Sequence, residues 1–505
     1  MASGAALVRS AFGRTASLGL TVVVNIAILP FIVHHLGERS YGIWVMVGSL
    51  LGYYGLLDLG LSSAVSRFVS RALGREDRDD ADRFIATGAY LFGACGLAVF
   101  AVTLAAAFAV PWFVEDAEEA RLFARVVAVM GFALALSFPA RCFIGVLNAH
   151  LRYDLVSLNE MVFILLRTGG IVWSLATGGG LLALAAITAA ADVAHNALLV
   201  YQAARVHGSF PIARARVDRA RARTLLGFGV YTFAAQIADL LRLQTYPILI
   251  STFLGLGSVA VYAISMRLAV MIPSVGIAVM STLAPVFSRQ EGRGALADMR
   301  RDYFLTFKLS SYLAVFVVGT TAILAPDFIT VWMGSEFSEA AGLLLILLPG
   351  MMFAVCQIPT LNLLYGTSRN RFYAATNGIE AALNVGLSLW LIQRHGLVGL
   401  ALGTAASMIA VKTLLQPLGA CQALGLSYPR YLLFRSLPNV AIPALYVALA
   451  AVAVRGWLAP DYLRLALVAA ALSLGYVPYV FFAGFSASER GRLVGALRSS
   501  VARGV

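Results

Sequence analysis

The stretch ILPFIVHHLGERSYGIW at residues 28–44 is matched later in the chain by YPILISTFLGLGSVAVYAI at residues 246–264. A proline and, further on, a Leu-Gly pair stand in the same order in both stretches. Three more correspondences share this offset of about 217–220 residues, which indicates an internal repeat. The matched positions are Pro30 with Pro247, Leu36 and Gly37 with Leu254 and Gly255, Pro139 with Pro359, Arg152 and Tyr153 with Arg371 and Phe372, and 179–186 with 396–403.

The composition around these stretches is that of a membrane protein. Hydrophobic residues make up 60% of the 505 residues and charged residues 12%, with a mean hydropathy of +0.83. Soluble domains are about 45–50% apolar and about 25% charged. A water-soluble fold of this length could not bury so much apolar surface, so the sequence predicts an all-α polytopic membrane protein.

Fourteen segments are apolar and long enough to cross a bilayer, which takes about 20 residues each. Six of them fit within one repeat period, so the two copies share one orientation, as in parallel-repeat transporters. The last two segments fall outside the repeat. The expected spans are 14–35, 41–65, 84–109, 121–147, 155–176, 180–204, 224–250, 257–285, 304–325, 340–364, 374–393, 397–416, 433–454 and 464–484.

The charges predict the orientation of these spans. With the N-terminus inside, 28 of the 38 basic residues lie in or beside inward connections and five in or beside outward ones. Basic residues favour the cytoplasmic side, so both termini are expected there. All six tryptophans then fall at outer ends of spans, where indole rings prefer to lie. The net charge of +13 therefore reflects orientation, and no nucleic-acid partner is expected.

The repeat and the charge runs together predict five parts. These are a six-helix lobe over 1–205, a basic cytoplasmic linker over 206–223, a second six-helix lobe over 224–420, two further helices over 421–485, and a basic amphipathic cytoplasmic tail over 486–505.

Several ionisable groups fall near the middle of the predicted spans, where their cost makes them functional candidates. Asp239 and Arg242 share one helix face with Gln236 close by, and Arg267 lies at similar depth on the next helix. One interpretation is a structural Asp239–Arg242 pair. The other is that Arg242 or Arg267 binds an anionic group, since guanidinium binds two phosphate oxygens at once.

The first half holds a second set at mid-depth. Arg167 is expected opposite Asp192, and His195 shares a helix face with Asp192. The two charges could form an inert pair between adjacent helices, or the carboxylate and the histidine could carry a proton during transport. Asn25 is also near mid-depth, where either a packing hydrogen bond or a substrate contact is possible.

Other charges lie closer to the interfaces, and we expect them to reach water by snorkelling. These are Glu160, Glu380, Arg125 and Lys412. The four cysteines lie far apart without metal-ligand spacing, and neither lysine belongs to a phosphate-binding loop. The sequence therefore predicts no catalytic residue, no cofactor and no metal.

The stretch LGERSYGIWVMVGSLLGYYGLLDLGLSSAVSRFVSRALGRED at residues 36–77 resembles the N-terminal hallmark of the polysaccharide transporter or O-antigen flippase family. Residues 366–372 and 396–407 are also similar to that family, which belongs to the multidrug/oligosaccharidyl-lipid/polysaccharide exporter superfamily. The resemblance implies two six-helix lobes. The hallmark positions are Tyr41, Gly42, Trp44, Asp58, Gly60 and Arg67.

The resemblance also implies a function, namely transfer of a polyprenyl-diphosphate-linked oligosaccharide from the inner to the outer leaflet of the bacterial inner membrane. Alternating access of two lobes would move this substrate. Membrane lipids, a polysaccharide polymerase and chain-length machinery are the other expected partners. A peptidoglycan-precursor flippase and a drug/cation antiporter are the alternatives. A polymerase or ligase is disfavoured because no large outer loop is present.

Overall fold

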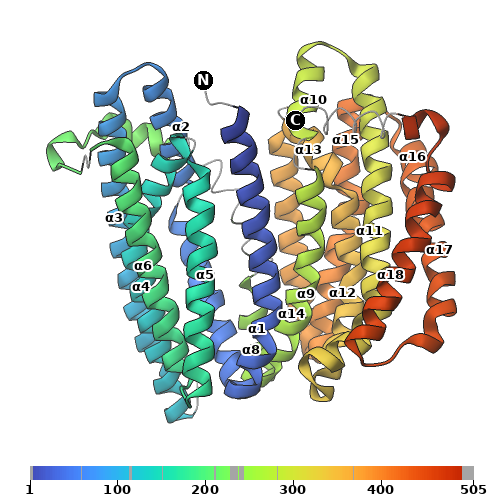
Figure 1. Cartoon of the computed structure of the whole chain (residues 1–505), viewed down its shortest axis with the longest axis horizontal. Coiled ribbons are helices and arrows are strands. Elements are labelled where there is room, and N and C mark those ends of the chain that lie inside the picture. Colours follow the sequence, from blue (N-terminus) through green and yellow to red (C-terminus); the bar gives the residue numbers. More distant parts are fainter. Residues whose placement is uncertain are drawn as a thin grey trace. The chain divides into compact units, whose positions relative to one another are not determined.

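The computed structural model describes residues 4–58, 60–112, 116–150, 152–209, 212–227, 237, 241, 244–280, 283–367 and 369–491. These residues form helices joined by short connections, without a strand among them (Figure 1). They divide into two compact units, Met1–Ala260 and Val261–Val505. The predicted all-α class is confirmed, whereas the five domain boundaries drawn from the sequence stay predictions.

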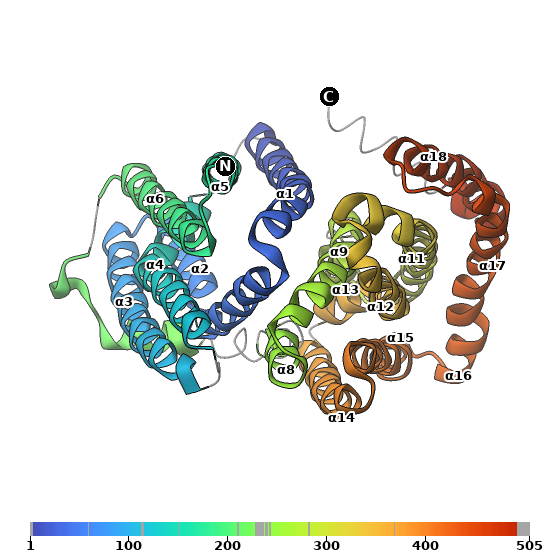
Figure 2. The same cartoon turned by 90° about the horizontal axis from the view of Figure 1, so that it is seen from below.

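In the first unit, α3 and α6 both pack against α4, while α5 packs against both α1 and α6 (Figure 2). The helix α8 contacts the later part of α1. The elements are α1 Gly4–Tyr53, η1 Tyr54–Asp58, α2 Leu61–Gly74, α3 Arg78–Ala109, η2 Val110–Trp112, α4 Ala117–Ala149, α5 Tyr153–Ala176, α6 Leu181–His207, η3 Arg214–Arg216 and α8 Tyr246–Leu254.

In the second unit, α12 packs against both α11 and α14, and α17 and α18 pack against α11. The chain enters this unit within α9. The main elements are α9 Leu256–Met280, α10 Leu283–Gly292, α11 Leu296–Met333, α12 Ser338–Cys356, α13 Ile358–Gly366, α14 Asn370–Ala410, η5 Val411–Leu415, α15 Gln416–Leu424, α16 Tyr428–Tyr431, η6 Leu432–Ser436, α17 Leu437–Val454 and α18 Tyr462–Tyr479.

The backbone repeats itself at the offset found in the sequence. Eight described residues with positive φ form four pairs separated by 217 or 218 positions. Positive φ is uncommon outside glycine, so such turns are specific markers of local geometry. The pairs are Gly37 with Gly255, Glu76 with Gly294, Gly178 with Gly396, and Gly208 with Gly425. The two copies of the repeat thus turn at corresponding points, which supports the repeat independently of residue identity.

Within the described part of the chain, eleven helical stretches are long and apolar enough to cross a membrane. Two of them exceed fifty residues, Gly19–Gly74 and Arg371–Leu424. Each is broken inside by a glycine with non-helical angles, Gly37 or Gly396, and therefore covers two of the predicted spans. The multi-pass class is confirmed. The exact count of fourteen stays a prediction, because most of 224–250 lies outside the described residues.

Two predicted spans lie within candidate membrane spans, but their α-helices are interrupted. The span 41–65 ends its α-helix at Tyr53, passes through η1, and restarts as α2 after Gly60, whose φ of 71° is left-handed. The span 340–364 divides at Gln357 into α12 and α13. Mean hydropathy shows neither break, because a single polar residue such as Asp58 or Gln357 changes the average of a mostly apolar span very little.

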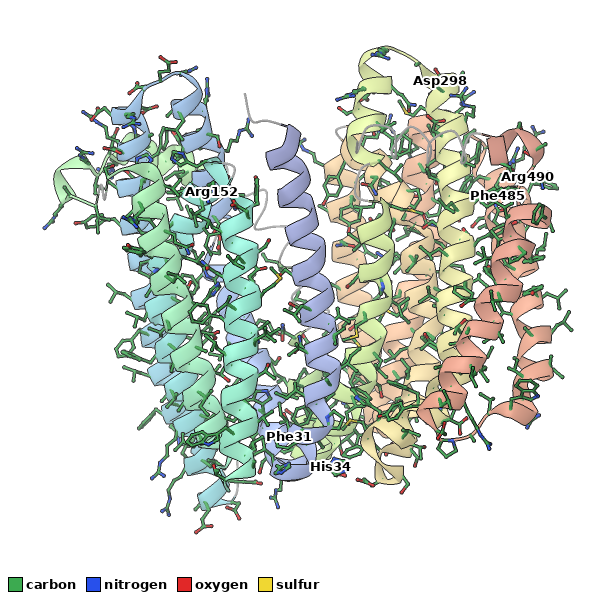
Figure 3. All side chains as sticks on the ribbon, in the orientation of Figure 1. Phe31, His34, Arg152, Asp298, Phe485 and Arg490 are labelled. Atoms are coloured by element: carbon green, nitrogen blue, oxygen red, sulfur yellow. The ribbon has the colours of Figure 1, made fainter. Side chains whose placement is uncertain are left out.

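Basic and aromatic side chains mark the two ends of the first unit. Arg152, which the charge pattern places inside, lies at one end of these helices, and Phe31 and His34, placed outside, lie at the other (Figure 3). These three residues therefore lie at opposite ends of the helices, and which end faces the cytoplasm stays a prediction. Only residues 486–491 of the predicted amphipathic tail are described; 492–505 lie outside the described residues.

Candidate functional site

Arg167 on α5 and Asp192 on α6 form an ion pair, with Arg167 Nη1 3.7 Å from Asp192 Oδ1. At 1.5 Å per residue, both residues lie within about 4 Å of the midpoint of their helices. The first unit does not enclose them, because their side chains are 33% and 46% exposed. Charged groups at membrane depth almost always face a bundle interior or a water-filled cavity. The pair therefore marks a polar face on α5 and α6.

His195 extends this polar face by one turn of α6. Its ring lies 5.3 Å from that of Phe163, and its Nε2 atom is buried without a hydrogen-bond partner among the described residues. On α5, Glu160 accepts a hydrogen bond of 2.9 Å from Ser17 of α1. Three helices thus contribute polar groups to one region, and the imidazole of His195 could exchange a proton there.

A pair of amide side chains also joins α5 to α6. Asn159 of α5 and Gln202 of α6 exchange hydrogen bonds of 2.8 and 3.3 Å. Asn159 is buried, so this pair holds the two helices together inside the first unit. Buried amides with hydrogen-bond partners, such as Asn159 and Gln202, stabilise a helix bundle. Partly exposed charges at similar depth, such as Arg167 and Asp192, are available to a substrate.

The remaining candidates differ in what the structure shows of them. Asn25 donates to the Thr21 carbonyl at 2.7 Å, so its amide hydrogen bonds within its own helix. Arg267 is exposed on α9 inside a membrane-spanning segment, and its proposed contact with an anion stays a prediction. Gln236, Asp239 and Arg242 lie outside the described residues.

Two hallmark residues shape the break before α2. Asp58 accepts hydrogen bonds from the backbone nitrogen and the hydroxyl of Ser62, at 3.3 and 2.9 Å, and lies 3.5 Å from Arg141 of α4. Gly60 supplies the left-handed turn that starts α2. This part of the hallmark positions a helix, and its conformation needs a glycine and a short acidic side chain.

Another hallmark residue marks a close backbone approach. A Cβ atom at Gly42 would lie 2.0 Å from the Leu256 carbonyl oxygen, so only glycine fits there. Tyr41 beside it is buried, whereas Arg67 is exposed on α2. Trp44 packs beside a buried apolar cluster between α1 and α4. The contact between Gly42 and Leu256 joins the helix that follows Gly37 to the residue that follows Gly255, and Gly255 is the counterpart of Gly37 in the repeat.

The second unit contains a buried ion pair that corrects the sequence interpretation. Lys412 Nζ lies 2.9 Å from Glu380 Oε2, and their side chains are 7% and 1% exposed. Both residues were expected to snorkel to water. Instead the π-helical segment η5 and the preceding part of α14 enclose them, because η5 follows α14 back along the same packed hairpin. The pair therefore lies in the protein interior.

A buried polar stripe continues from this pair. Asn384 donates to the Ser407 hydroxyl at 3.4 Å. Ser388 Oγ and Gln416 Nε2 are buried without hydrogen-bond partners in the described structure. Sequence reasoning missed the stripe, although Asn377, Glu380, Asn384 and Ser388 recur at helical spacing on one face. That periodicity was the available signal.

The described residues offer nothing that resembles a metal centre, since no three His, Cys, Asp or Glu side chains come together as ligands. The four cysteines are free thiols, and three of them are buried. The polar chemistry of the described spans is therefore that of ion pairs and amides, which can bind charged or hydroxylated groups.

Comparison with known proteins identifies the wider group. A family model described as polysaccharide biosynthesis protein matches residues 39–342. The protein named "Uncharacterized membrane protein EpsK" from Bacillus subtilis is 24% identical over 415 residues, covering 79% of this chain and 80% of its own. "Probable low-salt glycan biosynthesis flippase Agl15" from Haloferax volcanii is 23% identical over 391 residues, covering 77% and 78%.

Solved structures share the fold at low identity. The inward closed conformation of the lipid II flippase MurJ has a TM-score of 0.72 at 12% identity and covers 94% of this chain and 99% of its own. An inward-facing multidrug resistance MATE family transporter of the MOP superfamily has a TM-score of 0.69 at 15% identity and covers 80% and 95%. Since the family model spans more than half of the residues, the chain belongs to the polysaccharide biosynthesis protein family, with the fold of the MOP exporter superfamily.

Proposed function

We propose that this protein is a flippase for a polyprenyl-diphosphate-linked oligosaccharide, moving it from the inner to the outer leaflet of the bacterial cytoplasmic membrane. The observation that supports this function most directly is the Arg167–Asp192 ion pair, which is partly exposed at the middle of two membrane-spanning helices. Family membership supports a transporter of this general kind. It also supports a role without catalysis, in surface polysaccharide biosynthesis.

The chemistry of such a substrate suits these residues. Its diphosphate carries negative charge and its sugars carry hydroxyl groups, while its hydrocarbon chain can stay in the bilayer. Arg167 can bind phosphate oxygens through its planar fork of donors when Asp192 releases it. Exposed Arg267 offers a second guanidinium within a spanning segment, and Arg242 is a further candidate. Alternating access of the two halves is the proposed route.

We also propose that proton binding is coupled to substrate transport in the region of Asp192 and His195. Asp192 and His195 lie three residues apart on α6, so their side chains share a helix face. A carboxylate whose arginine partner turns to the substrate would favour protonation of the nearby imidazole. Proton binding and substrate binding would then be linked through one ion pair.

Two other substrate classes are compatible with the fold. The MurJ likeness concerns the fold alone, because identity is 12%. A peptidoglycan-precursor flippase would act on a lipid diphosphate too, whereas a drug/cation antiporter would need a cation-binding cavity. The partly exposed arginine favours an anionic substrate. We propose a surface-polysaccharide polymerase and its chain-length machinery as the protein partners. We also propose that both termini of the chain are cytoplasmic.

Complementation tests the proposal. The gene is expressed in a strain that lacks its own O-antigen flippase but keeps the rest of the pathway, and the surface glycan is stained and sized. The proposal expects glycan to return with the wild-type chain and not with Arg167→Gln at equal protein level. A parallel strain depleted of its lipid II flippase tests the alternative of a peptidoglycan-precursor flippase. If the chain restores growth of that strain but does not restore surface glycan in the first strain, the proposal is contradicted.

A further inference from the structure

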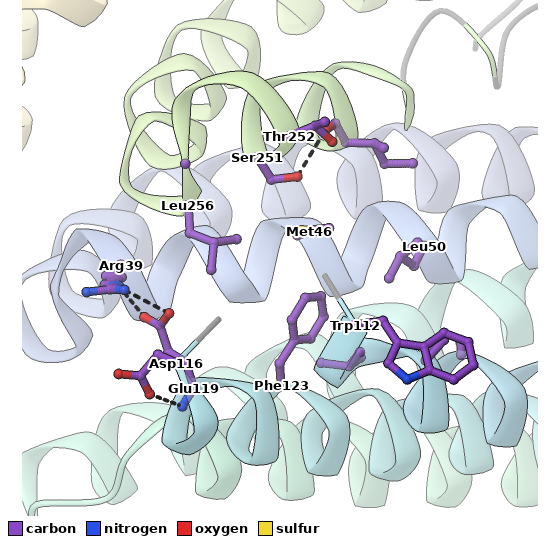
Figure 4. Close-up of a pocket in the computed structure, with 15 residues that line it drawn as sticks. Arg39, Met46, Leu50, Trp112, Asp116, Glu119, Phe123, Ser251, Thr252 and Leu256 are labelled. Atoms are coloured by element: carbon purple, nitrogen blue, oxygen red, sulfur yellow. Dashed lines mark hydrogen bonds and ion pairs between the residues drawn. The ribbon is translucent and has the colours of Figure 1, made fainter. Parts of the chain in front are cut away.

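The first unit contains a cavity of about 690 Å³ on the side that the charge pattern places outside (Figure 4). Its lining comes from the part of α1 after Gly37, from the end of α3 with η2, from the cap and first turns of α4, and from α8 together with Gly255 and Leu256. This cavity is separate from the Arg167–Asp192 pair, because neither α5 nor α6 contributes to its lining. The cavity is therefore a different site from that ion pair.

One wall of the cavity is charged. Arg39 Nη2 donates to Glu119 Oε2 at 3.0 Å, and the Arg39 side chain remains 69% exposed while that of Glu119 is 15% exposed. Asp116 caps α4 by accepting hydrogen bonds from Glu119 and Glu118, which hold the pKa of its carboxyl below the ordinary value. The wall thus keeps fixed carboxylates and a guanidinium with donors directed toward open space.

Another part of the cavity is aromatic. Trp112 is 74% exposed, and its ring packs edge-on against that of Phe108, with the ring centroids 5.8 Å apart. Figure 4 shows the Trp112 ring and the Arg39–Glu119 pair at different ends of this lining. Met46, Leu50 and Phe123 add apolar surface to the lining. Small-molecule sites typically combine such apolar surface with a few placed polar groups.

We propose that this cavity binds sugar residues of the transported glycan on the outer side of the membrane. A sugar ring has an apolar C–H face that can stack on an exposed indole, and hydroxyl groups that can hydrogen-bond to a carboxylate or guanidinium. A lipid chain would need only the apolar part and would leave the charged wall unused. This inference rests on the proposed function, because it takes the glycan as the cargo.

The test uses the purified full chain in detergent and a defined probe. The probe is the oligosaccharide released by mild acid from the lipid-linked pool of the strain that carries the gene, and calorimetry gives its dissociation constant. Polyprenyl phosphate without sugar is the second probe. The variants are Trp112→Ala, Arg39→Ala and, as a matched control, Trp173→Ala. Trp173 belongs to the same unit and is 70% exposed, but does not line the cavity.

We expect Trp112→Ala and Arg39→Ala each to weaken oligosaccharide binding tenfold or more, with Trp173→Ala unchanged and polyprenyl phosphate binding unchanged in all variants. The inference is overturned if the wild type does not bind the oligosaccharide. Equal binding by Trp112→Ala and wild type overturns it too, as does equal weakening by Trp173→Ala. Transport by the wild type in proteoliposomes is measured separately, so that a failure of the cavity and a failure of the flippase proposal are distinct results.

Discussion

Removing one member of the buried Glu380–Lys412 pair should destabilise the protein strongly. The two side chains are 2.9 Å apart and 7% or less exposed, so each neutralises the other inside the second unit. Breaking a buried pair leaves an uncompensated charge and costs about 3–5 kcal/mol. Glu380→Gln and Lys412→Met are each expected to lower the free energy of unfolding by this amount. That change corresponds to a factor of about 10² to 10⁴ in the folded-to-unfolded ratio.

The double variant Glu380→Gln with Lys412→Met removes both charges together, so most of the loss should be recovered. We expect a coupling free energy of at least about 2 kcal/mol between the two sites. The control cycle uses Asp79 and Arg83, which lie 2.8 Å apart but are 65% and 46% exposed. Exposed pairs contribute about 0.2–1 kcal/mol.

Equilibrium unfolding in mixed micelles with increasing SDS, followed by tryptophan fluorescence, gives each free energy. Single variants as stable as the wild type would refute the reasoning. So would an additive cycle at Glu380 and Lys412, because it would mean that the two charges do not neutralise each other in the folded chain.

Three further predictions follow from contacts in the first unit. Gly42→Ala should cost at least about 1–3 kcal/mol of unfolding free energy, because its Cβ would lie 2.0 Å from the Leu256 oxygen. Gly48→Ala, with nothing within 4 Å, should be neutral or stabilising in the same SDS titration. Asp192→Asn should slow glycan transport in proteoliposomes tenfold or more and flatten its pH dependence; an unchanged pH profile contradicts the coupling proposal. Burial, then His207 and Arg78, lower the pKa of His150 from 6.5, so stability present above pH 6.5 should fall on acidification. His150→Gln should reduce that loss in unfolding measured at several pH values.

The internal repeat could be predicted from the sequence because short stretches of a few residues mark it. A Leu-Gly turn can be recognised by residue type, and the structure places positive φ at Gly37 and Gly255 alike. The pairing of Arg167 with Asp192 was also open to prediction, since both stand at mid-depth on adjacent helices.

The break between Asp58 and Leu61 and the pairing of Glu380 with Lys412 could not be predicted in the same way, although the polar periodicity around Glu380 was visible in the sequence. The break depends on a backbone conformation that no hydropathy pattern records. Depth in a span does not tell which face a charge takes, and the burial of Lys412 depends on how η5 packs against α14. Tertiary contacts decided both, and a window of sequence does not contain them.

The most direct measurement is the rate at which the purified chain moves a polyprenyl-diphosphate-linked oligosaccharide across a proteoliposome membrane. Glycan that has crossed is detected by a lectin added outside. We predict transfer at least tenfold faster than in protein-free vesicles. Arg167→Gln should abolish this transfer, whereas Arg394→Gln should keep it, because the Arg394 guanidinium packs 4.6 Å from the centroid of the Trp390 ring. Wild-type vesicles that transfer no faster than empty ones, or full transfer by Arg167→Gln, would contradict it.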